Sequence, residues 1–290
     1  MDYICHILVI ALIYSLFALS LNLELGFAGL YNFGHIAFFG MGAYVSAIGS
    51  LNGVPVPLAM LTAMAVAGAA GGLLSVPTLR LSGDYFGIAT LVFAEMVHLI
   101  LLNEREITRG PMGLPNIPRP GWIGAGPESL PVFMVFTALV VLVSFALLYR
   151  ISSSPFGRAL KVVREDEFVA QALGKNTFAL KSKAMITGSC FAGLAGALWA
   201  HYITYISPSD FTLTETILVL LCVVLGGKGT QTGPFVGAFT IVFFGEFVRF
   251  IPIPAEFTRF VAPIQGMVYG FILIVIMLKR PQGIIPESKP

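Results

Sequence analysis

Charged residues are scarce in this sequence of 290 residues, and their scarcity excludes most classes of soluble protein. Asp, Glu, Lys and Arg make up 11% of the chain, whereas hydrophobic residues make up 57%. The mean hydropathy is accordingly high, at +0.87. A soluble domain carries about a quarter charged residues, so the chain lacks the polar surface that water requires. The net charge of +2 is also too small to indicate a nucleic-acid partner.

Cysteine and histidine are few as well, and neither residue type forms a ligand pattern. The three cysteines, at positions 5, 190 and 222, lie in separate apolar stretches, and the four histidines form no pair. A metal site or a disulfide framework needs closer and more regular spacing. We therefore expect no metal site and interpret the cysteines as small buried hydrophobic residues.

The sequence also lacks a recognisable motif for binding or hydrolysing ATP. Its nearest approach to a phosphate-binding loop is Gly227-Lys228-Gly229. A P-loop would need Gly where Cys222 stands, and Ser or Thr where Gly229 stands. We find no set of nucleophile, base and orienting residue, so we predict no catalytic residue and no cofactor. If the protein pumps a solute, the energy must come from a partner or an ion gradient.

Long apolar segments, by contrast, are abundant. Nine reach or approach the length that crosses a bilayer, so the sequence predicts one all-α, polytopic membrane domain over residues 1–290. Eight or ten spans are also compatible, because the Gly-rich joins at 26–34 and 226–233 are of the kind that forms re-entrant segments. The predicted spans are 4–24, 29–50, 55–77, 84–103, 131–149, 184–206, 214–226, 234–250 and 263–279.

Positive charge is concentrated between residues 150 and 183, which hold seven of the seventeen Lys and Arg residues beside three acids. A basic loop of this length marks the cytoplasmic face of a membrane protein. With this loop inside, twelve Lys and Arg residues lie inside and five outside, and the N-terminus is outside and the C-terminus cytoplasmic. Asp2 stands where a signal peptide needs Lys or Arg, so we expect the first segment to be an uncleaved helix.

The cytoplasmic loop, 151–183, carries the start and stop signals of short helices. Ser154-Pro155 is an N-cap followed by proline at the first helical position. Asp166-Glu167 begins a second helix with an apolar face, Gly174 ends it, and Asn176-Thr177 caps the next span. The 166–174 pattern fits two interpretations equally well: a helix that docks on a partner, and one that lies on the membrane surface.

Polar residues interrupt the apolar segments near two clusters of glycine, at 26–42 and 226–233. Such interruptions are typical of broken helices that line a path, and an ionisable residue within a span is a functional candidate by default. The candidate residues of a translocation path are Asn22, Glu24, Asn32, His35, Glu95 and Lys228. Glycines spaced four apart, such as Gly68 and Gly72, more simply predict close helix packing.

Several stretches closely resemble the permease subunits of branched-chain amino acid ABC importers, and the LivM type in particular. The resemblance extends over nearly the whole sequence and includes unusual short polar motifs within apolar segments. The stretches are 21–29, 33–44, 83–91, 108–114, 154–160, 164–167, 192–197 and 280–284.

The resemblance implies an ABC importer permease fold and import of branched-chain, apolar amino acids across a bacterial or archaeal cytoplasmic membrane. It also implies a LivH-type second permease, two ATPase subunits of the LivG and LivF type, and an external solute-binding protein. Related permeases carry urea or short amides, which is the alternative substrate class. An ion-coupled secondary transporter is the alternative from another class, although no chain of acids recurs through successive helices.

In ABC importers a short cytoplasmic helix followed by Gly docks in a groove of the ATPase, so the resemblance favours docking for 166–174. Ala170 and Gly174 match the Ala-x-x-x-Gly part of that motif. The Glu-Ala-Ala opening is out of register, because Phe168 stands at its first position and Glu167 lies one place early. The predicted coupling residues are Glu165, Asp166, Glu167, Phe168, Ala170, Leu173 and Gly174.

Overall fold

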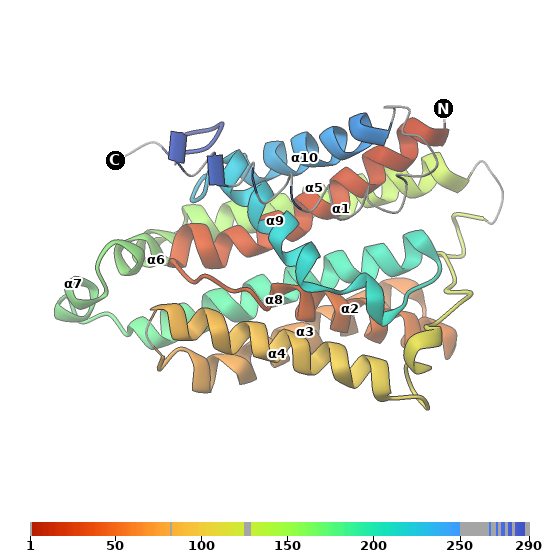
Figure 1. Ribbon diagram of the computed structural model, residues 1–290, viewed down its shortest axis with the longest axis horizontal. Helices are drawn as coiled ribbons and strands as arrows, with labels where there is room; N and C mark the ends of the chain where they lie inside the picture. The colour runs from red at the N-terminus through yellow and green to blue at the C-terminus, as the bar shows by residue number, and fades with distance from the viewer. Residues whose placement is uncertain are drawn as a thin grey trace.

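The computed structural model is a bundle of long helices that run along one common axis (Figure 1). It describes residues 2–81, 83–124, 129–249 and 282–287, together with six single positions between 267 and 279. Apart from one isolated bridge between Leu114 and Ile206, these residues form helices, turns and loops. The α-helices are α1 (Asp2–Asn22), α2 (His35–Leu51), α3 (Val56–Thr78), α4 (Gly83–Asn103), α5 (Ser129–Ser153), α6 (Pro155–Glu165), α7 (Glu167–Ala172), α8 (Thr177–Ile203), α9 (Leu213–Gly226) and α10 (Gly233–Arg249).

Five helical segments are long and apolar enough to cross a membrane. They are Tyr3–Phe27, Val56–Thr78, Gly83–Asn103, Ser129–Ser153 and Pro208–Gly226, and two shorter apolar helices are His35–Leu51 and Gly233–Glu246. The prediction of a polytopic helical membrane protein is confirmed. The predicted span 263–279 lies mostly outside the described residues, so the number of nine is not tested.

Two predicted boundaries differ from the observed ones by more than five residues. The span expected at 29–50 begins only at His35, because residues 28–34 leave the helix. The span expected at 184–206 begins seven residues earlier, at Thr177. Lys181 and Lys183 lie in this first part of α8, and their charge lowers the hydropathy that marks a span.

Helix α8 is the centre of the bundle and packs against α1, α2 and α3. Its contacts with α2 depend on glycine, because a Cβ at Gly42 would meet the backbone of Gly193, and one at Gly196 would meet the backbone of Phe39. Small residues allow such close approach in lipid, where the hydrophobic effect does not draw helices together. The close packing predicted for Gly68 and Gly72 of α3 is confirmed, because added Cβ atoms there would meet Cys190 and Ile186 of α8.

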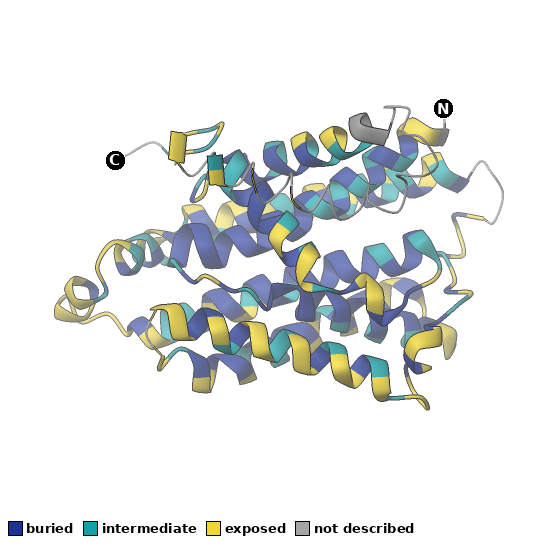
Figure 2. Ribbon diagram, viewed as in Figure 1, coloured by how far each residue is buried: buried dark blue, intermediate teal, exposed yellow. Residues whose placement is uncertain are grey.

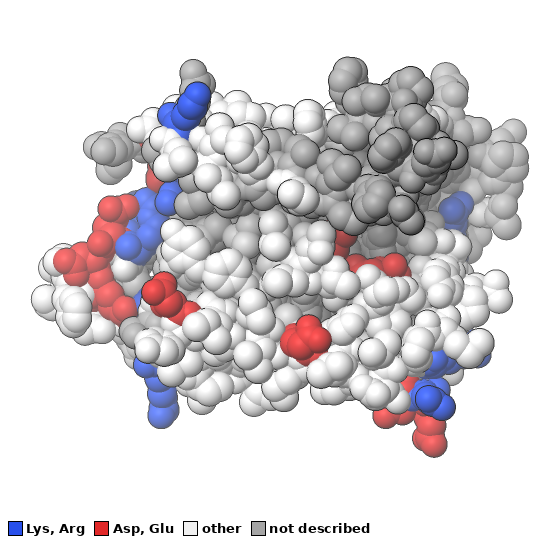
Figure 3. Space-filling view, in the orientation of Figure 1, with Lys and Arg blue, Asp and Glu red and all other residues white. Residues whose placement is uncertain are grey.

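The outward faces of the long helices are apolar. Figure 2 shows exposed residues in stripes along α3, α4 and α5, and these include Leu73, Ile88 and Leu142. Most charged groups lie near the two ends of the molecule in Figure 3, with a largely uncharged surface between them. Lipid or another apolar partner must cover such a surface, as expected for a membrane-spanning bundle.

We predict that Gly42→Ala lowers the stability of the bundle by about 1–3 kcal/mol, because the added methyl group forces α2 away from α8. Thermal unfolding of the detergent-solubilised chain measures this loss. Gly121→Ala is the matched control, since nothing lies within 4 Å of its Cβ position. Equal unfolding temperatures for the two variants would contradict the role of Gly42.

Candidate functional site: a broken helix and a projecting arm

The first helix does not pass directly into the second. After Asn22 the chain makes a π-helical turn at Leu23–Phe27, and Gly29 adopts a φ of 71° that ends the helical path. Residues 28–34 then run through the bundle before α2 begins (Figure 1). Non-helical backbone at membrane depth is tolerated only inside protein or against water.

Local hydrogen bonds satisfy much of this irregular backbone. Leu30 N donates to Glu24 O at 2.9 Å, Gly34 N donates to the Asn32 side chain at 2.9 Å, and Phe33 N donates to Thr90 Oγ1 of α4 at 3.2 Å. A Cβ at Gly34 would meet the backbone of Thr90. The predicted break at 26–34 therefore exists, and α4 supports it.

A fully buried polar cluster lies beside the break. Asn32 Nδ2 donates to Glu24 Oε2 at 2.7 Å, and Glu24 Oε1 lies 3.5 Å from His35 Nδ1. The other ring nitrogen of His35 shares a hydrogen bond of 2.8 Å with Ser20 Oγ, and the ring stacks on Phe17. Three of the six predicted path residues thus meet in one cluster inside the chain. Ser20 was missed, because a lone serine in an apolar helix carries no signal of its own.

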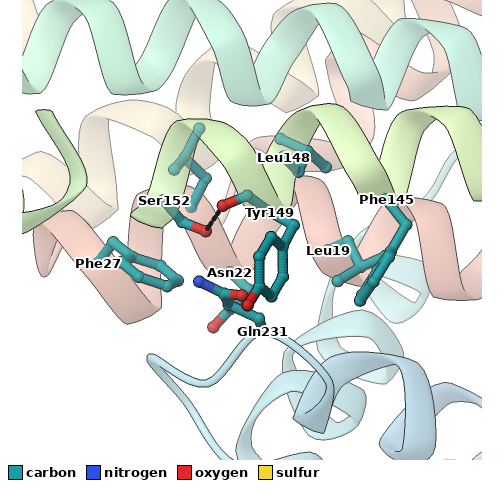
Figure 4. A pocket seen from close by; sticks show the side chains of 9 residues that line it. Leu19, Asn22, Phe27, Phe145, Leu148, Tyr149, Ser152 and Gln231 are labelled. Atoms are coloured by element: carbon teal, nitrogen blue, oxygen red, sulfur yellow. Dashed lines mark hydrogen bonds between the residues drawn. The ribbon is translucent and has the colours of Figure 1, made fainter. Parts of the chain in front are cut away.

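Asn22 takes part in a different contact, with the glycine loop between α9 and α10. Its amide donates to Thr230 O at 2.7 Å and accepts from Gly229 N at 3.0 Å. A small cavity of about 20 Å³ lies here, and Figure 4 shows Asn22, Tyr149 and Gln231 together in the middle of it. This volume holds about one water molecule, so the cavity is too small for a solute.

Glu95 and Lys228 lie apart from both groups. Each is exposed, Glu95 on the outward face of α4 and Lys228 at the tip of the glycine loop. A charge near the middle of a membrane-spanning helix is costly against lipid. The face of α4 around Glu95 is therefore suited to water or a second chain rather than to hydrocarbon.

The loop between α5 and α8 has the caps that the sequence predicts. Ser154 accepts a hydrogen bond from Phe156 N at the start of α6. Asp166 accepts from Phe168 N and Val169 N, and thereby caps α7. Gly174, with φ of 75°, follows Leu173, the C-cap of α7, and the Asn176 side chain caps α8.

Helix α7 projects beyond the end of the bundle, at the far left of Figure 1. Its apolar side chains point away from the chain: Phe168 is 82% exposed and Leu173 is 68% exposed. Ala170 is buried and faces the neighbouring elements instead. Because two apolar side chains are offered to solvent on a capped helix, α7 is suited to insertion into a groove of another protein.

An ion pair connects the start of α7 to the N-terminal part of α8. Lys181 Nζ lies 2.5 Å from Glu167 Oε2. Partial burial alone would raise the pKa of the Glu167 carboxyl, but hydrogen bonds from Lys181 and Thr177 and the charge of Lys181 lower it overall. Glu167 is thus ionised near neutral pH, and its ion pair anchors α7 to its own chain. This role explains why the acid lies one place before the position that the Glu-Ala-Ala motif predicts.

Arg164, near the end of α6, joins three separate parts of the chain. Its guanidinium donates to Gly26 O in the π-helical turn at 2.5 Å and to Glu287 Oε2 at 3.0 Å. Lys161 also pairs with Glu287, at 2.5 Å. Burial disfavours the charged form of Arg164, but hydrogen bonds to Glu165 and Glu287 outweigh it and raise the pKa of Arg164. Helices α6 and α7, residues 155–172, form a projecting arm. Arg164 therefore connects this arm to the broken helix.

These features define a polytopic helical membrane protein with an interrupted first helix and a projecting arm. Residues 3–277 match the family described as branched-chain amino acid transport system / permease component, and the chain belongs to this family. As a permease component it is a transport subunit and not itself an enzyme.

Relatives agree with the family assignment. The chain is 34% identical over 308 residues to the high-affinity branched-chain amino acid transport system permease protein LivM of Escherichia coli, covering 97% of this chain and 69% of the relative. It is 28% identical over 335 residues to the probable LivM of Methanocaldococcus jannaschii, covering 99% and 94%. It is also 25% identical over 288 residues to LivH of Salmonella typhimurium, covering 94% and 91%. No solved structure shows a significant match.

We predict that Asp166→Ala unwinds α7, because the loss of an N-cap costs about 1 kcal/mol and a helix of six residues has little else to stabilise it. Amide hydrogen exchange of residues 167–174 should accelerate severalfold. Asp166→Asn keeps a capping side chain and should retain the slower exchange. If the wild type, Asp166→Ala and Asp166→Asn all exchange at the same rate, the cap does not order α7.

Proposed function

We propose that this chain and a related second permease form the membrane path through which a bacterial or archaeal cell imports branched-chain amino acids. Two separate ATPase subunits supply the energy, and an external solute-binding protein delivers the cargo. The printed names of the relatives support the substrate class and the pairing of a LivM-type with a LivH-type permease. The whole chain is one transmembrane domain, and residues 151–183 are its cytoplasmic loop.

The exposed apolar face of α7 is the observation that carries the coupling proposal. A helix that lay on the membrane surface would stay level with the ends of the spans, with its axis across the bundle and its apolar face against lipid. Instead α7 extends past the ends of α5 and α8 (Figure 1). Phe168 and Leu173 supply the apolar contact with an ATPase groove, while Asp166, Glu165 and Gly174 fix the shape of the arm. Ala170 and Glu167 hold the arm to its own chain.

The orientation follows from the same arm. We place α7 in the cytoplasm, where the ATPases are, together with the basic residues of the loop. The N-terminus lies at the opposite end of the bundle and the C-terminal segment lies at the same end as α7 (Figure 1). This arrangement supports an external N-terminus and a cytoplasmic C-terminus.

The contacts of Arg164 supply a route for movement from the arm into the membrane. When an ATPase groove displaces α7, α6 moves with it, and Arg164 carries that displacement to the Gly26 carbonyl. Gly26 belongs to the same π-helical turn as Glu24, whose side chain binds Asn32. We therefore assign Asn22, Glu24, Asn32 and His35 to a movable break next to the path, rather than to the path surface. Glu95 and Lys228 face water or the second permease.

We predict that Phe168→Asp abolishes coupling while leaving the chain folded, because the side chain touches nothing that the bundle needs. A charge placed in an apolar groove should lower leucine-dependent ATP hydrolysis of the reconstituted transporter by at least about tenfold. Phe168→Leu is the control and should keep most of the activity. Wild-type uptake by the Asp variant would rule out docking through this face.

We predict that Arg164→Met raises the number of ATP molecules hydrolysed per leucine imported, by about tenfold, because α6 loses its link to the broken helix. Arg158→Met is the matched control, since Arg158 lies on the same helix, is exposed, and among the described residues bonds to Ser153 O within its own loop. Both rates are measured on the same proteoliposomes. An unchanged ratio for Arg164→Met would show that force does not pass through this contact.

A further inference from the structure

Helix α4 lies at the edge of the bundle and leaves one long face uncovered (Figure 1). Five of its 21 residues are buried, and the helix contacts α2, α3 and the 3₁₀ turns Gly110–Met112 and Pro208–Asp210. Its other side is exposed along its whole length, as Figure 2 shows. Residues three or four positions apart lie on one face of a helix. The residues of this α4 stripe are Tyr85, Ile88, Val92, Glu95, Met96 and Leu99.

Glu95 lies within this stripe at a depth where lipid tails would surround it. It follows Gly83 by 12 residues and precedes Asn103 by eight, so it is about 18 Å and 12 Å from the two ends of α4 at 1.5 Å per residue. Figure 3 shows an acidic group by itself in the uncharged surface over the middle of α4. A glutamate side chain is too short to reach the headgroups from there, and lipid tails offer no hydrogen-bond donor.

Other glutamates in the membrane-spanning part of the chain have donors of their own. Three of them lie in apolar helical segments and accept a hydrogen bond from a side chain of the same chain. The pairs are Glu24 with Asn32, Glu215 with Tyr14, and Glu246 with Tyr3. Glu95 has no such partner in the part of the chain that the structure describes. The donor for its carboxyl group must therefore come from another molecule.

A second copy of this chain does not supply that donor. In a twofold-symmetric pair the same face of α4 packs on itself, which brings the two Glu95 side chains toward each other. An ionised carboxyl group only accepts hydrogen bonds, and two adjacent carboxylates disfavour each other's charge. A different membrane protein is able to present an amide, a hydroxyl or a basic group at the same depth. The stripe thus fits an apolar helix of a non-identical chain that carries a donor.

We infer that the α4 stripe is the surface on which the second permease binds, and that a hydrogen-bond donor of that subunit pairs with Glu95 inside the membrane. The inference rests on the proposed function and adds the contact surface to it. The opposite side of α4 supports the helix break, because Thr90 Oγ1 accepts from Phe33 N at 3.2 Å. Helix α4 therefore lies between the second permease and residues 28–34.

Photo-crosslinking in the assembled transporter tests where the second permease binds. The photoreactive residue p-benzoylphenylalanine replaces Met96, which lies next to Glu95 in the stripe and is exposed. Illumination should give a product that contains this chain and the second permease, identified by mass spectrometry. Leu142 is the matched control, since it is equally apolar and exposed but lies on α5. Its replacement by the same residue should give no such product.

Glu95→Leu distinguishes a protein partner from lipid. Leucine suits hydrocarbon better than glutamate does, so the change would leave the association of the two permeases intact if lipid covered the stripe. At the inferred interface the change leaves a donor of the partner unpaired, and the Kd between the two permeases in lipid nanodiscs should rise about tenfold. Glu95→Gln keeps an acceptor and should raise the Kd less. Met96→Leu, a volume-conserving change beside it, should bind as the wild type does.

The outcomes separate this inference from the proposed function. If the wild-type complex imports leucine while the Met96 position cross-links only to lipid or to another copy of this chain, the inference fails and the function stands. The inference also fails if Glu95→Leu leaves the Kd unchanged. If no second permease binds the wild-type chain, the proposed function fails together with the inference.

Discussion

A chain that crosses a bilayer has to satisfy its backbone N–H and C=O groups within the protein, and residues 28–34 must do so without a helix. The carboxylate of Glu24, the amide of Asn32 and the hydroxyl group of Thr90 make this possible, because they fix the turn and bind the exposed backbone groups. The position of α2 depends on that turn, and α2 in turn packs closely on the central helix α8. The arrangement of the helices thus depends on one buried irregular segment.

The same segment connects the membrane interior to the projecting arm. Arg164 reaches Gly26 from α6, and Glu287 of the C-terminal segment forms ion pairs with both Arg164 and Lys161. The C-terminal segment is itself fixed to the glycine loop, since Ile284 N and Ile285 N donate to Leu225 O and Gly226 O at 2.7 and 2.9 Å. Three elements distant in sequence therefore meet at one cationic group. In the proposed coupling, a displacement of α6 would act on the helix break through this contact.

Local features of this structure could be predicted from the sequence, because caps and stops act over three or four residues. Asp166 and Gly174 mark the ends of α7 in the sequence as they do in the structure. The glycines at 26–34 indicate a break, but its length could not be predicted, since only the hydrogen bonds of residues 28–34 show that α2 begins at His35. The contact of Arg164 with Gly26 joins residues 138 positions apart, and no local pattern marks it.

Labelling of a single cysteine on the arm tests most directly whether α7 lies in the cytoplasm and binds the ATPase subunits. In a cysteine-free background with Phe168→Cys, a membrane-impermeant thiol reagent should not react in intact cells. It should react in inverted vesicles stripped of the ATPases, and added ATPase subunits should protect the thiol. Labelling from outside intact cells, or labelling of inverted vesicles that the ATPases leave unchanged, would contradict the proposed coupling.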